Sequence, residues 1–187
     1  MRRPDTTARP PLRGDQRRLD LIAFLGALCL FFSTIEYLFP KPVPFFRLGL
    51  ANLPILIALD VLAPGEILLL VALKVVGQGL VNGTLASYVF LFSAAGSVSS
   101  ALVMLGVHRL FGKRISLVGV SLFGALASNA VQITLSVTFI FGATSWVIAP
   151  LLGGLGVASG LVVGLFAERF RERSRWLAVV KERIDAP

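Results

Sequence analysis

Long apolar runs alternate with short charged segments along this chain, and the alternation restricts it to a membrane-spanning fold. Over half of the 187 residues are hydrophobic and only 15% are charged, whereas soluble domains carry about a quarter charged residues. A helix needs about 20 apolar residues to cross the hydrocarbon layer, and several runs approach that length. Because a helix pairs its own backbone groups, the runs predict an all-α integral membrane protein.

Six runs predict six transmembrane helices between a basic tail (1–20) and a charged tail (167–187). The first run is too long for a signal peptide and is expected to be retained. The second and third runs are short, so a four-span alternative with a re-entrant hairpin at Ala63-Pro64-Gly65 stays open. The predicted helices cover Leu21–Phe39, Leu48–Leu62, Glu66–Val81, Ala86–Val107, Leu117–Ile140 and Trp146–Phe166.

Basic residues predict the orientation. Fifteen of the 18 Lys and Arg residues lie in the two tails or in the loop after the fourth helix. With six spans, all three places are cytoplasmic, as the positive-inside rule requires. We therefore expect a multi-pass protein of the inner (cytoplasmic) membrane, in contact with lipid, with both termini inside. The net charge of +8 then needs no nucleic-acid partner.

The charged tail itself has two interpretations. Between Glu168 and Ile184, arginines and glutamates alternate with Trp176 and other apolar side chains. This pattern fits an amphipathic helix on the inner leaflet. A solvated tail fits it equally well.

Polar side chains at membrane depth are the candidate functional residues. Lys74 falls near the predicted midplane, where an ionisable group costs roughly 2.5–3.5 kcal/mol to insert. Gln78 and Asn82 follow at four-residue steps and share its helical face. Asn129 and Gln132 form a second polar face at similar depth. We expect the two faces to meet in a cavity in the outer half of the bundle.

The region after the first helix adds three further candidates. Glu36 lies near the outer end of that helix, and Arg47 ends a loop stiffened by Pro40, Pro42 and Pro44, while Asn52 interrupts the second helix. Such a loop is suited to capping a cavity beneath it. Structural alternatives remain open for the whole set. Lys74 would form a salt bridge with Glu36 or Asp60, the amides would hydrogen-bond between helices, and Arg47 would anchor the interface.

Small residues predict helix packing. The sixth predicted helix carries Gly156, Gly160 and Gly164 at four-residue spacing, with Gly153 nearby, and the fourth carries Ser93, Gly96, Ser97 and Ser100. Small residues let membrane helices approach closely. We expect these stripes to pack against neighbouring helices of the same chain.

The sequence lacks the residue patterns of several common catalytic and cofactor-binding sites. The chain has no Gly-x-x-x-x-Gly-Lys-Ser/Thr motif for ATP. Its five aspartates never form the clustered pair that holds magnesium and a diphosphate. Cys29 is the single cysteine, and no His/Cys cluster accompanies it. The sequence therefore predicts no metal site, no cofactor and no enzymatic activity.

The segments Arg47–Pro54 and Lys74–Ser87 carry a family resemblance. They read Arg-Leu-Gly-Leu-Ala-Asn-Leu-Pro and Lys-Val-Val-Gly-Gln-Gly-Leu-Val-Asn-Gly-Thr-Leu-Ala-Ser. They resemble the bacterial membrane family described as Gx transporters or as heptaprenyl diphosphate synthase component I, and the resemblance extends over Leu21 to Phe166. That family is similar to the six-helix substrate-binding subunits (S components) of energy-coupling-factor transporters.

The resemblance implies an uptake function. Such subunits bind a vitamin or micronutrient beneath the loop after helix one, and dock through an Ala-x-x-x-Ala pair onto a coupling subunit and two ATPases. Ala23 and Ala27 match that pair. We expect a small-molecule-binding transporter subunit, with Glu36, Arg47, Asn52, Lys74, Gln78, Asn82, Asn129 and Gln132 lining the site. The alternative is a membrane accessory of heptaprenyl diphosphate synthase in isoprenoid or menaquinone synthesis.

Overall fold

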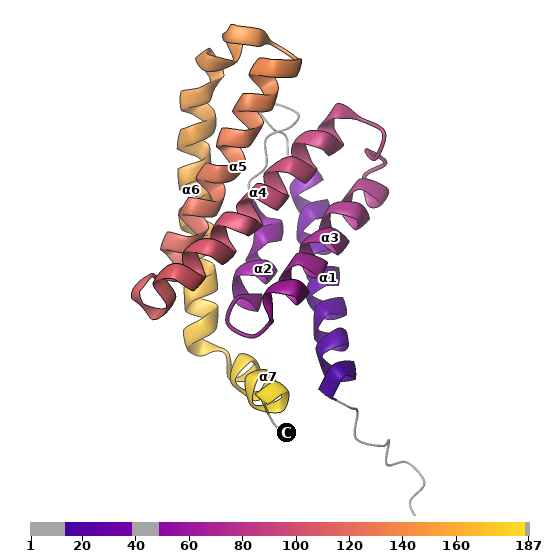
Figure 1. The fold of residues 1–187 in the computed structure, drawn as a ribbon, viewed down its shortest axis with the longest axis vertical. Helices are drawn as coiled ribbons and strands as arrows, with labels where there is room; N and C mark the ends of the chain where they lie inside the picture. The colour runs from indigo at the N-terminus through magenta and orange to yellow at the C-terminus, as the bar shows by residue number, and fades with distance from the viewer. Residues whose placement is uncertain (1–13, 39–48, 186–187) are drawn as a thin grey trace, which may run out of the picture.

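The computed structural model describes residues 14–38 and 49–185, which fold into a helical bundle (Figure 1). Five long helices form its body, and three 3₁₀ turns and two shorter helices complete the described part. The elements are α1 (Gly14–Leu38), η1 (Leu50–Asn52), α2 (Leu53–Ala58), α3 (Pro64–Val81), α4 (Tyr88–Phe111), η2 (Gly112–Arg114), α5 (Leu117–Phe139), η3 (Gly142–Thr144), α6 (Ser145–Arg173) and α7 (Arg175–Asp185).

Five helices of the described chain are long and apolar enough to cross a membrane, namely α1, α3, α4, α5 and α6. The predicted sixth span over Leu48–Leu62 is not confirmed. In its described part, from Gly49 onward, the helical pieces are η1 and α2, and the six residues of α2 rise only about 9 Å. Gly49 enters this segment in the left-handed conformation, with φ of 79°, and Pro54 occupies the first turn of α2. Gly49 therefore precedes the first helical turn of the segment, and Pro54 lies where a helix tolerates proline.

The short helix α2 is enclosed by protein. It contacts α1, α3, α5 and α6, and every residue from Pro54 to Ala58 is buried. Backbone groups at the ends of a short helix are tolerated at membrane depth only when other protein groups surround them. The long helices therefore surround α2 with protein rather than with lipid.

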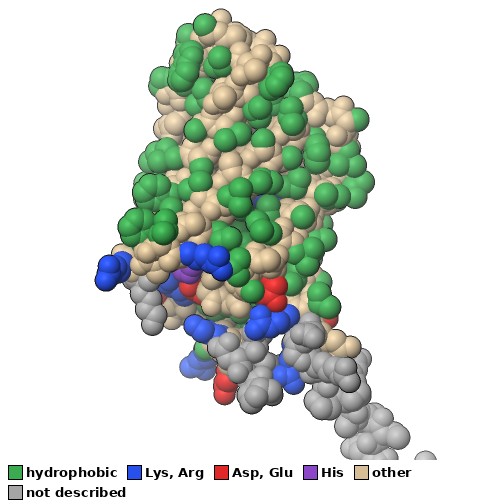
Figure 2. Space-filling model, in the orientation of Figure 1, with side chains coloured by type: hydrophobic (Ala, Val, Ile, Leu, Met, Phe, Trp, Pro, Cys, Tyr) green, Lys and Arg blue, Asp and Glu red, His purple; other side chains and the backbone are tan. Residues whose placement is uncertain are grey.

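Ion pairs gather at one end of the bundle. Arg18 of α1 pairs with Glu66 of α3 at 3.2 Å. Asp60, which follows α2, lies 3.5 Å from His108 of α4 and 3.6 Å from Arg171 of α6. The starts of α1 and α3 and the ends of α4 and α6 therefore share this charged end. In Figure 2 charged side chains gather there, and hydrophobic side chains are spread over the rest of the visible face.

Glycines bring α5 and α6 into close contact. A Cβ added at Gly164 would lie 2.6 Å from Val118 Cα, and one at Gly160 would lie 3.4 Å from Leu122 Cα. One at Gly156 would overlap Asn129. The packing predicted for these three glycines is confirmed. Gly153 faces open space instead, since nothing lies within 4 Å of its added Cβ.

Candidate functional site

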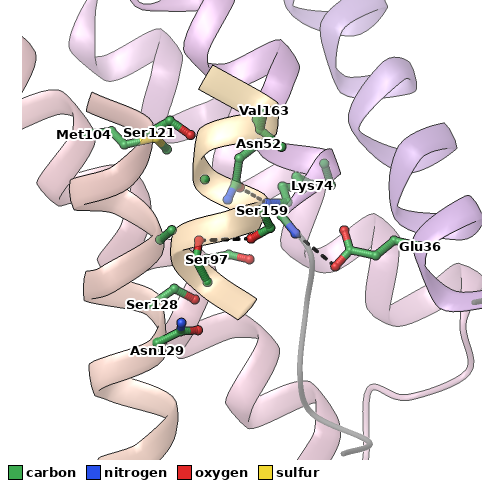
Figure 3. A pocket seen from close by; sticks show the side chains of 15 residues that line it. Glu36, Asn52, Lys74, Ser97, Met104, Ser121, Ser128, Asn129, Ser159 and Val163 are labelled. Atoms are coloured by element: carbon green, nitrogen blue, oxygen red, sulfur yellow. Dashed lines mark hydrogen bonds between the residues drawn. The ribbon is translucent and has the colours of Figure 1, made fainter. Parts of the chain in front are cut away.

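A polar cavity lies inside the bundle, where α1, η1, α3, α4, α5 and α6 meet (Figure 3). Its volume is about 40 Å³, and a water occupies about 10–15 Å³ on this measure, so the cavity has room for about three waters. Its lining residues are Glu36, Gly49, Ala51, Asn52, Lys74, Ser97, Met104, Ser121, Ala125, Ser128, Asn129, Gly156, Ser159, Gly160 and Val163.

Two buried ionisable side chains form the charged wall of the cavity. Glu36 of α1 is 2% exposed and Lys74 of α3 is 3% exposed. The ammonium of Lys74 donates a hydrogen bond to Oδ1 of Asn52. The backbone N–H of Gly49 donates to Oε1 of Glu36 at 3.1 Å. The segment leading into α2 is therefore fixed to α1 and α3 by polar groups that are costly to bury unless paired.

The opposite wall is uncharged but rich in hydroxyl and amide groups. Ser97 comes from α4, Ser128 and Asn129 come from α5, and Ser159 comes from α6. Asn129 Nδ2 donates to the carbonyl of Leu152 at 2.8 Å, which fixes that amide between α5 and α6. Figure 3 shows Ser128 and Asn129 on the side away from Glu36. A ligand in this space would therefore meet ionic groups on one side and neutral donors and acceptors on the other.

Four of the residues predicted from sequence line this cavity: Glu36, Asn52, Lys74 and Asn129. They reach it from α1, η1, α3 and α5, which are separated along the chain. The polar faces predicted on the third and fifth helices therefore contribute one residue each to a shared space.

Two predicted residues point elsewhere. Gln78 Nε2 donates to Ser93 of α4 at 3.2 Å, and Gln132 Nε2 donates to Ser128 at 3.3 Å. Both side chains are buried, and neither lines the cavity. Within the described residues, the Oε1 atom of each amide has no hydrogen-bond partner. Such buried acceptors are costly to leave unsatisfied, so they mark positions suited to water or ligand donors.

Of the last two predicted residues, Asn82 does not line the cavity and Arg47 cannot be placed. Asn82 ends α3, where its backbone N–H donates to the carbonyl of Gln78 at 3.0 Å. Its Nδ2 is buried and finds no partner in the described chain. Arg47 lies outside the described residues.

Sequence reasoning missed four cavity serines, namely Ser97, Ser121, Ser128 and Ser159. The available signal was their spacing. Ser121, Ala125, Ser128 and Asn129 repeat at helical intervals along one face of α5, and Gly156, Ser159, Gly160 and Val163 do so along α6. Hydroxyls in apolar helices usually hydrogen-bond their own backbone, as Ser159 Oγ does with the carbonyl of Gly156 at 3.1 Å, so the pattern alone indicates packing.

A second hollow lies on the outside of the bundle. It is an open apolar groove of about 580 Å³ between α1 and α3. The predicted docking residues Ala23 and Ala27 line it, and both are exposed. The other lining residues are Gly26, Leu30, Leu69, Ala72, Leu73, Val76, Gly77 and Leu80.

In the part of the chain that the structure describes, no three His, Cys, Asp or Glu side chains come together in a way that could hold a metal. The bundle instead combines membrane-length helices with an internal polar cavity, which defines a multi-pass membrane protein with a buried polar site. The chain belongs to the heptaprenyl diphosphate synthase component I family, whose model matches residues 25–170. No curated protein and no solved structure matches it.

Proposed function

We propose that this chain is the small-molecule-binding membrane subunit of an uptake transporter of the energy-coupling-factor type. The observation that carries the proposal is the cavity holding Glu36, Asn52, Lys74 and Asn129. Binding sites in helical membrane proteins are built from polar side chains that face the bundle interior, and an intramembrane ionisable residue marks such a site by default. The lining comes from α1, η1, α3, α4, α5 and α6. Polar residues that only joined two helices would involve two elements.

The cavity of about 40 Å³ is far smaller than the 300–1,000 Å³ typical of ligand pockets. A vitamin-sized molecule would therefore have to displace part of the lining. The segment from Gly49 to Asn52 is held by hydrogen bonds with Glu36 of α1 and Lys74 of α3 and by the burial of Ala51. It is the shortest element of the lining, and we expect a ligand to displace it first. A ligand that supplies its own partners to Glu36 and Lys74 would replace these bonds.

The groove between α1 and α3 supports a partner in the membrane. Its small side chains, Ala23, Gly26, Ala27, Ala72 and Gly77, allow another helix to approach closely. Along α1 the groove extends from Ala23 to Leu30, a rise of about 10 Å, or two turns of a facing helix. We assign it to the coupling transmembrane subunit, which would connect this chain to cytoplasmic ATPases.

Changing Ala27 to Leu is expected to weaken this docking about tenfold, because overpacking a close interface costs roughly 1–3 kcal/mol. The measurement is co-purification of partner chains with tagged protein from its native membrane. Ala158→Leu, at an exposed position of α6, is the matched control. Equal recovery of partners with both variants would contradict the assignment of the groove, and unchanged ligand binding by Ala27→Leu would show that the cavity is intact.

The second candidate function is a membrane accessory of heptaprenyl diphosphate synthesis, and the family description favours it. An apolar groove of this size would then hold part of a prenyl chain rather than a helix. The same co-purification separates the two functions. Recovery of an ATPase pair supports transport, whereas recovery of a soluble, aspartate-rich prenyl synthase supports the accessory role.

The proposed topology places the charged end, with both tails, in the cytoplasm. On a Cys29→Ala background, cysteine at Ala143 is expected to react with an impermeant maleimide in intact cells, and cysteine at Lys181 only after the membrane is opened. Both native side chains are exposed, and η3 lies at the opposite end of α6 from α7. The reverse labelling pattern would refute the orientation.

A further inference from the structure

The C-terminal helix α7 is attached to the charged end of the bundle. Figure 1 shows it turning away from α6 and lying across that end. Ser174 separates the two helices; its ψ of 106° is extended, and its hydroxyl accepts from Leu177 N–H at 3.2 Å. Leu177 is only 8% exposed, and Val180 packs against the main core. One face of α7 is therefore part of the folded structure.

An aromatic cluster connects α7 to two membrane-length helices. The ring centroid of Trp176 lies 5.7 Å from Phe24 of α1 and 6.4 Å from Phe170 of α6. All three rings remain open to the surroundings, at 40%, 49% and 38% exposure. Val179, three residues after Trp176, is exposed on the same side. Aromatic side chains in this position are typical of the level of the lipid headgroups.

Three exposed arginines flank the same rings in the sequence. Arg169 and Arg173 are four residues apart on α6, and Arg175 begins α7. Among the described side chains none of the three makes an ion pair, whereas Arg18 and Arg171 at the same end are both paired with carboxylates. The planar fork of arginine matches a phosphate group in geometry and charge.

We propose that this corner, formed by Phe24, Arg169, Phe170, Arg173, Arg175, Trp176 and Val179, binds the headgroup of an anionic phospholipid. The arginines would hold the phosphate and its net negative charge, and the exposed rings and Val179 would cover the first part of the acyl chains. Charge complementarity and the alternation of basic and apolar residues along the end of α6 and the start of α7 point to a lipid, because a free phosphate would make no use of the rings. Most of the corner lies beyond residue 170, where the family match ends.

The two tryptophans of the chain allow a direct test. In a Trp146→Phe variant, Trp176 is the sole tryptophan and reports the corner by its fluorescence. The purified full chain is reconstituted in phosphatidylcholine nanodiscs containing a minor share of phosphatidylglycerol, with bromine on the acyl chains of one lipid or the other. We expect brominated phosphatidylglycerol to quench Trp176 more strongly than its share of the lipid predicts.

The triple variant Arg169→Gln, Arg173→Gln, Arg175→Gln should remove this preference, with roughly a fivefold loss of lipid affinity for each arginine. The double variant Arg109→Gln, Arg114→Gln removes exposed arginines from the same end and should keep it. Equal loss in both variants would overturn the site in favour of general charge attraction. Quenching in proportion to composition, or full competition by soluble glycerol phosphate, would also overturn it.

Discussion

Replacing Lys74 with methionine is expected to abolish small-molecule binding and leave the bundle inserted. Lys74 is 3% exposed, lines the cavity and donates to Asn52, so it is in a position to meet a bound anionic group. Truncating one member of a buried charge contact weakens binding by about 2–5 kcal/mol, which is more than about 30-fold in affinity. Methionine keeps most of the length of the side chain and is easier to insert into a membrane, so the variant should still fold.

The measurement itself identifies the ligand. Wild-type protein, Lys74→Met and the exposed control Lys181→Met are purified in parallel, and the small molecules released from each are compared by mass spectrometry. A compound present with wild type and Lys181→Met but absent with Lys74→Met is the expected result. The same compound at equal occupancy in all three preparations would exclude Lys74 from the site.

Changing Gly164 to alanine is expected to destabilise the protein by about 2 kcal/mol, or roughly 4–8 °C in the unfolding midpoint. The new Cβ would lie 2.6 Å from Val118 Cα, so α5 and α6 must separate. The displacement also affects Ser121 of the cavity, whose Cβ would lie 3.1 Å from the new methyl group. Glu168, which accepts from Val118 N–H at 3.5 Å, would lose that contact.

Gly153→Ala is the matched control on the same helix. Nothing lies within 4 Å of its added Cβ, so only the helix-propensity gain of up to about 1 kcal/mol applies, and the midpoint should stay or rise. Thermal unfolding in detergent, followed by the loss of helical circular dichroism, measures both variants. A midpoint for Gly164→Ala at or above that of wild type would show that the α5–α6 contact is looser than described.

Hydropathy predicted the long helices because a helix that crosses a membrane needs a long run of apolar residues. The predicted spans Leu117–Ile140 and Glu66–Val81 lie within a few residues of α5 and α3. The same signal could not decide whether Leu48–Leu62 spans the membrane, since apolar residues are required equally by lipid and by a protein interior. α2 is buried by other helices, and no count of hydrophobic residues separates the two cases.

Two cavity residues could be predicted from the sequence because their depth in the membrane alone determines that they face the interior of the bundle. Lys74 and Asn129 had to face the interior because lipid excludes them, and both line the cavity. Gln78 shares the helical face of Lys74 but lies one turn further along α3, where Ser93 of α4 meets it first. That difference depends on how α3 and α4 cross, which the sequence does not specify. Ser121 and Ser159 are small enough for either helix packing or ligand binding. Only the three-dimensional structure, which brings both to one cavity, distinguishes the two roles.

The buried segment around α2 connects two groups of polar contacts, one at each of its ends. Its upper end carries Asn52, bonded to Lys74, and its lower end carries Asp60, bound to His108 and Arg171. Between them, Ile55 and Leu56 are completely buried among the other helices. A ligand that displaces Asn52 is therefore expected to shift Asp60 as well, because a closely packed segment joins the two residues.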